Sequence, residues 1–270
     1  MSLIRVNDLD DPRIADYRMV AEPELVRTRG LFVAEGRLVV ERVISDGRCA
    51  LRSLLLSDAA RAALEPVLGG LPDSTPIYVC GLKDFQPITG FNMHRGCLAL
   101  AERPAAIDRR HALETARTVL VLNGVANADN MGGVFRNAAA FGVDLVLLTP
   151  YCCDPLYRKA IRTSMAATLR VPFARVHGWA EAAAHLRQAG FTLVALTPRE
   201  PSQPLDEFVE SGCPDRVALV VGAEDRGLIA EIEDSADHRV RIPIDPRVDS
   251  LNLAVATGIA LARLSRGAAL

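Results

Sequence analysis

The chain has 270 residues, of which 50% are hydrophobic and 24% charged, and its formal net charge is −2. This length and apolar share are enough for two compact domains or one large one, and they exclude a disordered chain. The nearly neutral charge argues against indiscriminate coating of nucleic acid. Any contact with RNA or DNA therefore needs a local cluster of basic residues.

The cysteines and histidines indicate no metal or disulfide chemistry. The six cysteines form no C-x-x-C pair, and the five histidines are scattered without ligand spacing, so we expect neither a zinc site nor a disulfide framework. No window approaches the ~20 apolar residues of a membrane span, and no basic start with an apolar run follows Met1. We therefore expect a cytoplasmic protein without membrane contact and without a bound metal.

Helices and strands alternate over the first hundred residues. The pattern predicts helical segments at 12–29, 38–44 and 59–65, the last stopped by Pro66, and strands at 31–35, 51–56, 77–80 and 97–101. This alternation is typical of a small α/β layer structure rather than a helical bundle. A polar loop before the last strand holds His94 and Arg95. We favour a solvated turn there, with contact to an anionic partner as the alternative.

The polar run 103–110 contains a proline and breaks this alternation. We expect a first domain at 1–106, a linker at 107–116 and a second domain at 117–270. The second domain begins with a buried-type strand at 119–122, a polar segment at 123–133 that holds Asn130, and a helix from Val134. This order places the polar segment at the carboxyl end of a sheet, where α/β proteins bind ligands.

This segment matches neither of two common nucleotide-binding motifs. It lacks the G-x-G-x-x-G of dinucleotide-binding folds, and no G-K-S/T follows as in a P-loop. Arg136 is expected near the start of the helix, where a cation opposes the helix dipole. Such a placement mildly disfavours a purely structural role, and an exposed surface arginine is the alternative. Further along, Arg158, Lys159 and Arg162 form a basic cluster that suits phosphates, although charged runs are usually solvated faces.

The α/β alternation continues with a strand at 171–176, a helix at 180–188, a strand at 191–196 and a proline-rich loop at 197–204. A continuous apolar strand at 217–221 then fits a sheet covered on both faces. It ends in a loop that holds Glu224 between Gly222 and Gly227. Glu224 as the acid of a helix N-terminus is the usual interpretation. The two glycines suggest instead that a ligand or another backbone passes close by.

A short apolar segment at 240–244 precedes a polar loop and a helix with apolar residues at helical spacing. Ser250 is a natural N-cap for this helix. Asn252 would then stand in the first turn, where asparagine competes with the backbone for hydrogen bonds. This segment alone does not decide between two interpretations of Asn252: an asparagine that is merely tolerated in a capped helix, and an asparagine with a function.

Three strand-end loops carry polar motifs in a fixed order. The first has Asn130, Gly132, Arg136, Ala138, Phe141 and Gly142, the second Gly222, Glu224, Gly227 and Leu228, and the third Ile242, Pro243, Ile244, Ser250, Leu251 and Asn252. Together they resemble the three motifs of the SpoU/TrmH family of RNA ribose 2′-O-methyltransferases, in the SPOUT superfamily. Arg162 and Ser164 are also similar to the family, and the resemblance covers roughly residues 119–264.

The first hundred residues, with Phe32, Glu35, Gly36 and the strand entry at 95–99, resemble the L30e-like substrate-binding domain found upstream in this family. The resemblance implies an α/β SPOUT domain with a deep trefoil knot, preceded by the small L30e-like α/β domain. It also implies a homodimer through the knotted domain, S-adenosylmethionine as cofactor, and methylation of a ribose 2′-hydroxyl in structured RNA, ribosomal RNA before transfer RNA.

The same resemblance implies the residues of the site. The catalytic residues would be Asn130, Arg136, Glu224, Ser250 and Asn252. The cofactor would be bound by Gly222, Ala223, Gly227, Leu228, Ile242, Ile244, Leu251 and Leu253. For the RNA, the charge pattern itself predicts contacts by Arg158, Lys159, Arg162, His94 and Arg95. The chain departs from the family pattern at Ala223, Asp225, Arg226 and Ala254, so the details of the cofactor contacts stay open.

Two other functions remain as alternatives. A non-catalytic RNA-binding or ribosome-assembly protein could retain this fold, but the presence of all the expected catalytic residues argues against it. A dehydrogenase-like nucleotide enzyme is disfavoured by the missing glycine fingerprint.

Overall fold

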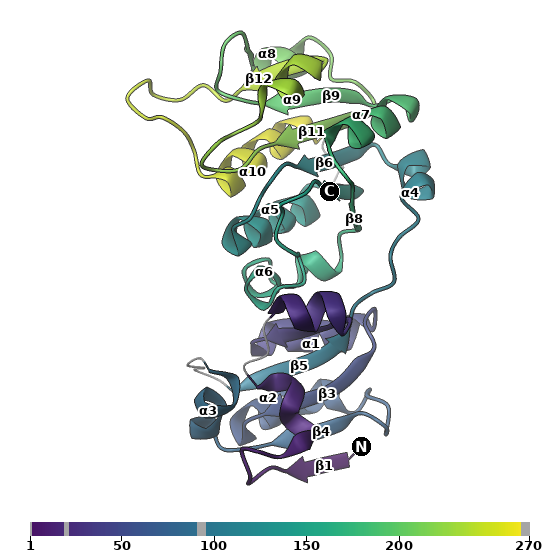
Figure 1. Cartoon of the computed structure of the whole chain (residues 1–270), viewed down its shortest axis with the longest axis vertical. Helices are drawn as coiled ribbons and strands as arrows, with labels where there is room; N and C mark the ends of the chain where they lie inside the picture. Colours follow the sequence, from purple (N-terminus) through teal and green to yellow (C-terminus); the bar gives the residue numbers. More distant parts are fainter. Residues whose placement is uncertain (1, 19–21, 91–95, 266–270) are drawn as a thin grey trace. The chain divides into compact units, whose positions relative to one another are not determined.

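The computed structural model describes residues 2–18, 22–90 and 96–265 of the chain (Figure 1). It divides into two compact units. Unit 1 comprises Met1–Ala105 and Asp154–Leu169, and unit 2 comprises Ala106–Cys153 and Arg170–Leu270. Of the helices in these described ranges, none is both long and apolar enough to cross a lipid bilayer.

Unit 1 is built on a five-stranded mixed sheet in the order β1-β4-β3-β5-β2. The strands are β1 Ser2–Arg5, β2 Leu31–Glu35, β3 Leu51–Leu56, β4 Pro76–Val79 and β5 Cys97–Glu102. The helices are α1 Arg37–Asp46, α2 Asp58–Leu68, α3 Phe85–Thr89 and α6 Arg158–Thr163, with shorter or irregular turns at Pro12–Tyr17, Glu24–Thr28, Leu82–Asp84 and Ala167–Leu169. The predicted strands at 31–35 and 51–56 are confirmed. The helix expected to stop at Pro66 continues to Leu68, because a proline in the last turn disrupts little of the helix's hydrogen bonding.

Unit 2 is built on a seven-stranded sheet in the order β10-β12-β9-β11-β6-β7-β8, and all neighbouring strands in it are parallel. The strands are β6 Thr118–Leu122, β7 Leu145–Leu148, β8 Phe173–Arg175, β9 Thr192–Leu196, β10 Gln203–Pro204, β11 Val217–Val221 and β12 His238–Arg241. The helices are α4 Arg109–Thr115, α5 Ala128–Ala140, α7 Trp179–Gln188, α8 Leu205–Glu210, α9 Ala230–Ser235 and α10 Leu253–Leu264. The expected α/β class is confirmed.

Helices cover both faces of the parallel sheet (Figure 1). On one face α4, α7 and α9 share a core with the strands, in which Leu186 and Ile232 join Val220. On the other face α5 packs along α10. A Cβ atom on Gly133 of α5 would lie only 2.7 Å from the Cβ of Ala254 of α10, so glycine permits this close approach. Since the strands are parallel, their carboxyl ends share one edge, and the polar loops follow there.

The structure differs from the predicted domain division at two places. The expected linker at 107–116 contains α4, whose Leu113 is buried in the unit 2 core and whose end is held by Arg216, which donates to the Ala116 carbonyl at 3.1 Å. The segment Asp154–Leu169, expected in the second domain, groups with unit 1, where α6 packs on β2. Both contacts join residues far apart in sequence, so no local pattern marks them.

Helix α5 begins at Ala128 rather than at Val134. Asn127 caps it, because its side-chain oxygen accepts hydrogen bonds from the backbone N–H of Asp129 at 2.8 Å and of Asn130 at 3.3 Å. Asn130 is therefore helical rather than part of a loop. Arg136 lies in the second half of the helix, so the expectation that it opposes the helix dipole is wrong.

Helix α10 begins at Leu253, and its N-cap is Asn252 rather than Ser250. The Asn252 side-chain oxygen accepts hydrogen bonds from the backbone N–H of Ala254 at 3.0 Å and of Val255 at 3.3 Å. The N-cap is a position where asparagine is strongly favoured. The cap therefore accounts for asparagine at a position that seemed unfavourable in sequence.

Candidate functional site

Three polar side chains from separate segments of unit 2 meet at the carboxyl edge of its sheet. The Asn130 Nδ2 on α5 donates to the Glu224 Oε2 in the loop after β11, at 2.6 Å. The Asn252 Nδ2 at the start of α10 donates to the Asn130 Oδ1 at 2.9 Å and to the Glu224 Oε1 at 3.3 Å. Each of the three residues thus bonds to both of the others.

This triad ties the loop after β11 to the N-terminal ends of α5 and α10. Asn130 is only 5% exposed, and both ends of its amide are engaged. Asn252 uses its oxygen to cap α10 and its nitrogen to bond Asn130 and Glu224. Capping and cross-linking are therefore done by one side chain, which answers the question that the sequence left open.

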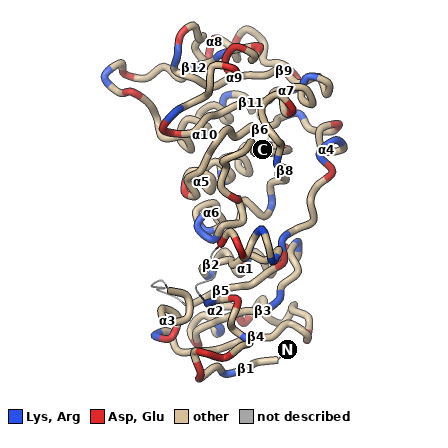
Figure 2. The backbone as a smooth tube through the Cα atoms, in the orientation of Figure 1, with Lys and Arg blue, Asp and Glu red and all other residues tan. Residues whose placement is uncertain are grey.

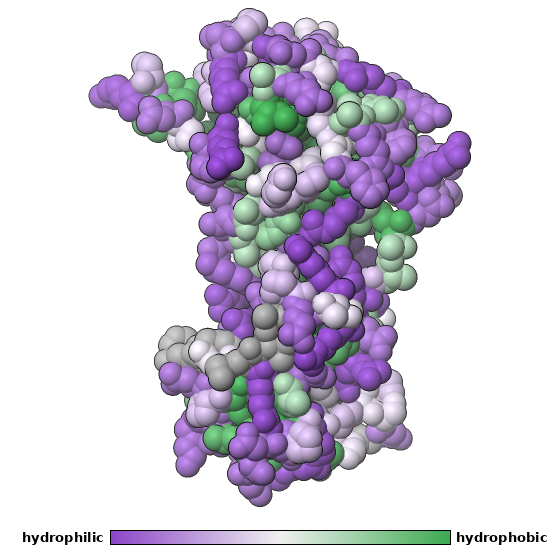
Figure 3. Space-filling view, in the orientation of Figure 1, coloured by the Kyte–Doolittle hydropathy of each residue, from purple (hydrophilic) through white to green (hydrophobic). Residues whose placement is uncertain are grey.

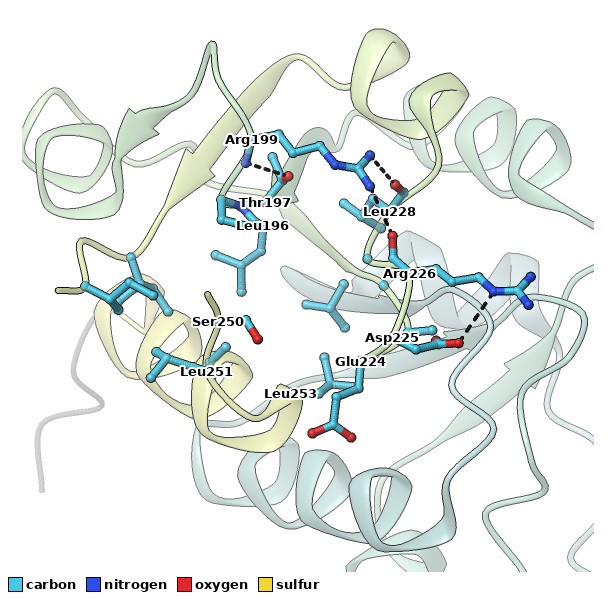
Figure 4. Close-up of a pocket in the computed structure, with 18 residues that line it drawn as sticks. Leu196, Thr197, Arg199, Glu224, Asp225, Arg226, Leu228, Ser250, Leu251 and Leu253 are labelled. Atoms are coloured by element: carbon cyan, nitrogen blue, oxygen red, sulfur yellow. Dashed lines mark hydrogen bonds and ion pairs between the residues drawn. The ribbon is translucent and has the colours of Figure 1, made fainter. Parts of the chain in front are cut away.

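A cavity of about 290 Å³ lies beside Glu224 of the triad (Figure 4). It is lined by residues of three segments: 196–199 after β9, 221–228 at the end of β11, and the stretch from Ile242 to Ala256 around the start of α10. All the residues expected to bind the cofactor line it, namely Gly222, Ala223, Gly227, Leu228, Ile242, Ile244, Leu251 and Leu253. Glu224 and Ser250 line it as well, whereas Asn130, Arg136 and Asn252 do not.

The loop after β11 folds back closely on itself. A Cβ atom on Gly222 would lie 2.2 Å from the carbonyl carbon of Gly227, and Gly227 has a φ of 66°. The Gly227 N–H donates to the Ala223 carbonyl at 2.8 Å. The two glycines therefore permit a close approach between two parts of one loop. Of the two close neighbours that the sequence suggested, a ligand or another backbone, the structure shows a backbone.

The loop after β9 was missed as part of the site. Arg199 donates from Nη1 to the Leu228 carbonyl at 3.0 Å and from Nη2 to the Arg226 carbonyl at 3.1 Å, so it holds the neighbouring loop (Figure 4). The Thr197 hydroxyl donates at 2.6 Å to Glu233, a carboxylate that is only 6% exposed. Its place in the sequence could have identified it, because this loop, like the other loops of the site, follows a buried strand.

Arg136 stands apart from the triad on the exposed surface of α5. At a rise of 1.5 Å per residue it lies about 9 Å along the helix axis from Asn130. Within the ranges that the structure describes, its guanidinium makes no hydrogen bond or ion pair. Its donors are therefore available to a ligand.

Basic residues cluster on α6 in unit 1 (Figure 2), and two of them approach a carboxylate of the same unit. Glu35 is 8% exposed; its Oε1 lies 2.9 Å from Arg162 Nη1, and its Oε2 lies 3.2 Å from Arg158 Nε. Partial burial lowers the pKa of Arg158, and the nearby Glu35 and Glu22 only partly oppose this shift. The arginine stays charged all the same. Lys159 lies between these arginines on the same helix. The predicted RNA contacts His94 and Arg95 fall outside the described residues.

The model of the SpoU rRNA Methylase family matches residues 117–262, which include the triad and the cavity. The chain belongs to this family. It is 38% identical to an uncharacterized tRNA/rRNA methyltransferase of Mycobacterium tuberculosis, over 97% of this chain and 91% of that protein. It is 28% identical to the 23S rRNA (guanosine-2′-O-)-methyltransferase of Vibrio vulnificus, over 62% of this chain and 68% of that one.

Solved structures are similar over nearly the whole chain. The AdoMet-bound rRNA methyltransferase of Sinorhizobium meliloti superimposes with a TM-score of 0.83 at 25% identity and covers 98% of both chains. AviRb of Streptomyces viridochromogenes, a SpoU methyltransferase, shares the fold with a TM-score of 0.78 at 19% identity, over 95% of this chain and 97% of that one. This family member is therefore an RNA methyltransferase with the SpoU fold.

Proposed function

We propose that the chain transfers a methyl group from S-adenosylmethionine to the ribose 2′-hydroxyl of a nucleotide in structured RNA, ribosomal RNA before transfer RNA. The observation that carries the proposal is the meeting of Asn130, Glu224 and Asn252 beside a cavity lined by the motif residues. The Vibrio vulnificus relative, a 23S rRNA (guanosine-2′-O-)-methyltransferase, supports the 2′-oxygen and ribosomal RNA. A cytoplasmic location is part of this proposal.

The cavity suits S-adenosylmethionine, which supplies an activated methyl group on a sulfonium sulfur. Its volume of about 290 Å³ is near the lower end for small-molecule sites, and such sites combine apolar walls with a few polar groups. Leu228, Ile242 and Leu251 provide apolar walls for a purine ring, and the backbone around Gly222 provides polar groups close by. Arg199 keeps these walls in place through its bonds to the loop carbonyls.

Arg136 is the residue that we assign to the RNA side of the reaction. Its exposed guanidinium can donate to a phosphate and to the ribose oxygen as negative charge develops there. A literal role as general base is excluded physically, since a guanidinium keeps its proton in proteins. Each well-placed donor of this kind is worth about 3 to 4 kcal/mol in a transition state.

The triad positions the site rather than touching the ribose. Asn130 is buried and engaged at both ends, so we assign it to holding the loops rather than to contact with the ribose. Glu224 and Asn252 complete this clamp, and Ser250 borders the cofactor cavity (Figure 4). Holding reacting groups in place contributes about 7 to 11 kcal/mol in favourable cases.

We infer that unit 1 is an L30e-like domain that selects the RNA and that α6 contributes phosphate contacts. Arg162 is half exposed and engages Glu35 through Nη1, and a guanidinium has five N–H donors in all. An incoming phosphate can thus bind an arginine that is already paired. Lys159 adds a second cation on the same helix.

The trefoil knot and the homodimer through the C-terminal segment also belong to this proposal. On α10, Val255 and Ile259 are 51% and 38% exposed, and residues four apart lie on one helix face. Val248, in the loop before α10, is 53% exposed. Figure 3 shows one face of the molecule, on which hydrophobic surface forms small patches among hydrophilic side chains. These exposed apolar side chains around α10 support pairing with a second copy.

Transfer of tritium from methyl-labelled S-adenosylmethionine tests the proposal. RNA from cells that lack the gene is fractionated into ribosomal and transfer RNA. Each fraction is incubated with the protein and the labelled S-adenosylmethionine, and is then hydrolysed in alkali. A 2′-O-methyl group blocks alkaline cleavage at its nucleotide, so the label should appear in dinucleotides from ribosomal RNA. Label in mononucleotides would place the methyl group on a base and contradict the proposal. Absence of cofactor binding would favour the non-catalytic alternative.

A further inference from the structure

Tyr151 is an aromatic side chain that the fold leaves uncovered. It follows β7 and is 89% exposed, the largest fraction among the described large hydrophobic residues. Nothing in the packing of unit 2 requires an aromatic ring at this position. Exposure alone is common for single residues, so the argument depends on the backbone that carries the ring.

The backbone at Tyr151 has a φ of 68°, a region that L side chains rarely adopt. Tyr151 is the third residue of a turn closed by the Cys152 N–H, which donates to the Thr149 carbonyl at 3.5 Å. With Pro150 second and a positive φ third, the turn has the pattern of type II, which strongly prefers glycine at the third position. Tyrosine is thus unfavourable here both for the backbone and for its exposed ring.

The turn is fixed to the loop that leads into α5. The Thr149 hydroxyl donates to the Asn123 Oδ1 at 3.0 Å and accepts from the Gly124 N–H at 3.2 Å. Thr149 is itself 2% exposed. The base of the turn is therefore buried and hydrogen-bonded.

Cys152 and Arg175 hold the far side of the same turn. The Cys152 thiol donates to the Leu122 carbonyl at 3.2 Å and accepts from the Val125 N–H at 3.3 Å. Arg175 donates to the carbonyls of Cys152 at 3.3 Å and Cys153 at 3.4 Å. Tyr151 is thus presented by a rigid support, which lowers the entropy cost of binding through it.

The position of the turn relates it to the proposed reaction site. Leu148, Leu122 and Val221 form one row across β7, β6 and β11, and Tyr151 follows this row at the same edge as Glu224. Two strand spacings separate β7 from β11, on the order of 10 Å. An RNA strand with one ribose at the site can therefore place a neighbouring nucleotide at Tyr151.

We propose that Tyr151 is a stacking platform for an RNA base that flanks the methylated nucleotide. Proteins that recognise unpaired RNA stack its bases on exposed aromatic rings, and they do so with little sequence preference. A ring open to solvent on a rigid, strained turn fits this role. The inference rests on the proposed function, since it requires RNA at this edge of the sheet.

The test uses a set of single-stranded RNA octamers, each with 2-aminopurine at one position, because stacking on an aromatic ring quenches its fluorescence. The full-length protein should quench it at one or more positions. Tyr151→Ala should lose the quenching and bind at least about fivefold more weakly, whereas Tyr151→Phe should retain both. Tyr151→Gly should show the same loss of quenching and the same weakening as Tyr151→Ala but fold normally, since glycine suits the positive φ.

Two controls distinguish base stacking from charge attraction and from damage to the cofactor site. Binding of heparin, a polyanion without bases, should not change in Tyr151→Ala, and S-adenosylmethionine affinity should not change either. Equal RNA binding by wild type and Tyr151→Ala, absence of quenching at every position, or a change in oligomeric state alone would each overturn the inference. Failure of the wild type to methylate any RNA would instead contradict the proposed function, and the stacking measurement does not depend on it.

Discussion

Helices α5 and α6 both carry arginines that the sequence assigns to RNA, but the fold treats them differently. Arg136 on α5 is exposed and makes no hydrogen bond or ion pair within the described ranges. Arg158 and Arg162 on α6 approach the two oxygens of Glu35. A basic residue that the sequence assigns to RNA can therefore be paired within the protein instead of being fully available to a ligand. Only the folded structure distinguishes these two cases.

The difference follows from the cost of burying a carboxylate. Glu35 is 8% exposed, and a buried ionised carboxylate needs a charged partner to offset its lost hydration. The arginines of α6 therefore stabilise unit 1 before they meet any RNA. Arg136 has no such structural task, so its loss should affect chemistry and not folding.

Arg136→Ala should produce the largest effect. Losing its donors should lower the methyl-transfer rate about 10²- to 10³-fold, because they act where charge develops. RNA affinity should change by only about threefold, the share of one phosphate contact among several. Single-turnover transfer and RNA binding measure the two quantities, with Arg110→Ala on the exposed surface of α4 as the matched control. An undiminished transfer rate would remove Arg136 from the mechanism.

Glu35→Gln should have the opposite character. Removing the charge takes one carboxylate away from two partly buried guanidinium groups, so unit 1 should lose about 2 kcal/mol of stability, below the value for fully buried pairs. The released arginines should also bind RNA more tightly, and the slope of log K against log salt should steepen by up to about 1 to 2. Denaturant titration and salt-dependent binding measure these effects. Unchanged stability would show that the ion pairs are weak.

Asn252→Ser tests a polar group that is held rather than free. Serine can also cap α10, but it cannot donate to both Asn130 and Glu224, so the triad should loosen while the helix stays intact. We expect about a fivefold to tenfold loss of transfer rate, with little change in the melting temperature. Asn252→Ala loses the cap as well and should cost about 1 kcal/mol of stability. If both variants kept full activity, the triad would have no role in positioning.

Arg199→Lys should give the smallest effect. Arg199 is held like the arginines of α6, but by carbonyls of the cofactor loop. Lysine keeps the charge but cannot span the Leu228 and Arg226 carbonyls with one planar group. Cofactor affinity should fall about threefold, with the transfer rate at saturating cofactor preserved. Calorimetry measures the affinity, and a fall in rate without a fall in affinity would contradict the assignment.

Much of the parallel sheet was predictable from the sequence, because its strands are apolar runs followed by glycine or polar residues. The meeting of Glu224 and Asn252 was accessible only through the resemblance, since motif order says nothing about distance. The start of α5 was missed because Gly132 and Gly133 suggested a loop. Packing decided the matter, since Gly133 is where Ala254 of α10 approaches.

The contacts that were not predictable join distant parts of the chain. Glu35 pairs with Arg162 across 127 positions, and Arg199 binds a carbonyl 29 positions away. Neither leaves a periodic or spaced pattern, because the partners meet only after the chain has folded. Asn252 shows the reverse case, in which a residue that looked unfavourable locally becomes favourable once the helix start is placed correctly.

The most direct test of the account is calorimetric titration of S-adenosylmethionine into the wild type and into two Ala→Phe variants. Ala256 lines the cavity from α10, and Ala184 is exposed on α7. The account predicts saturable binding by the wild type and by Ala184→Phe, and no binding by Ala256→Phe, whose ring fills the cavity. Undiminished binding by a folded Ala256→Phe would show that the cofactor binds elsewhere and would contradict the assignment of this cavity.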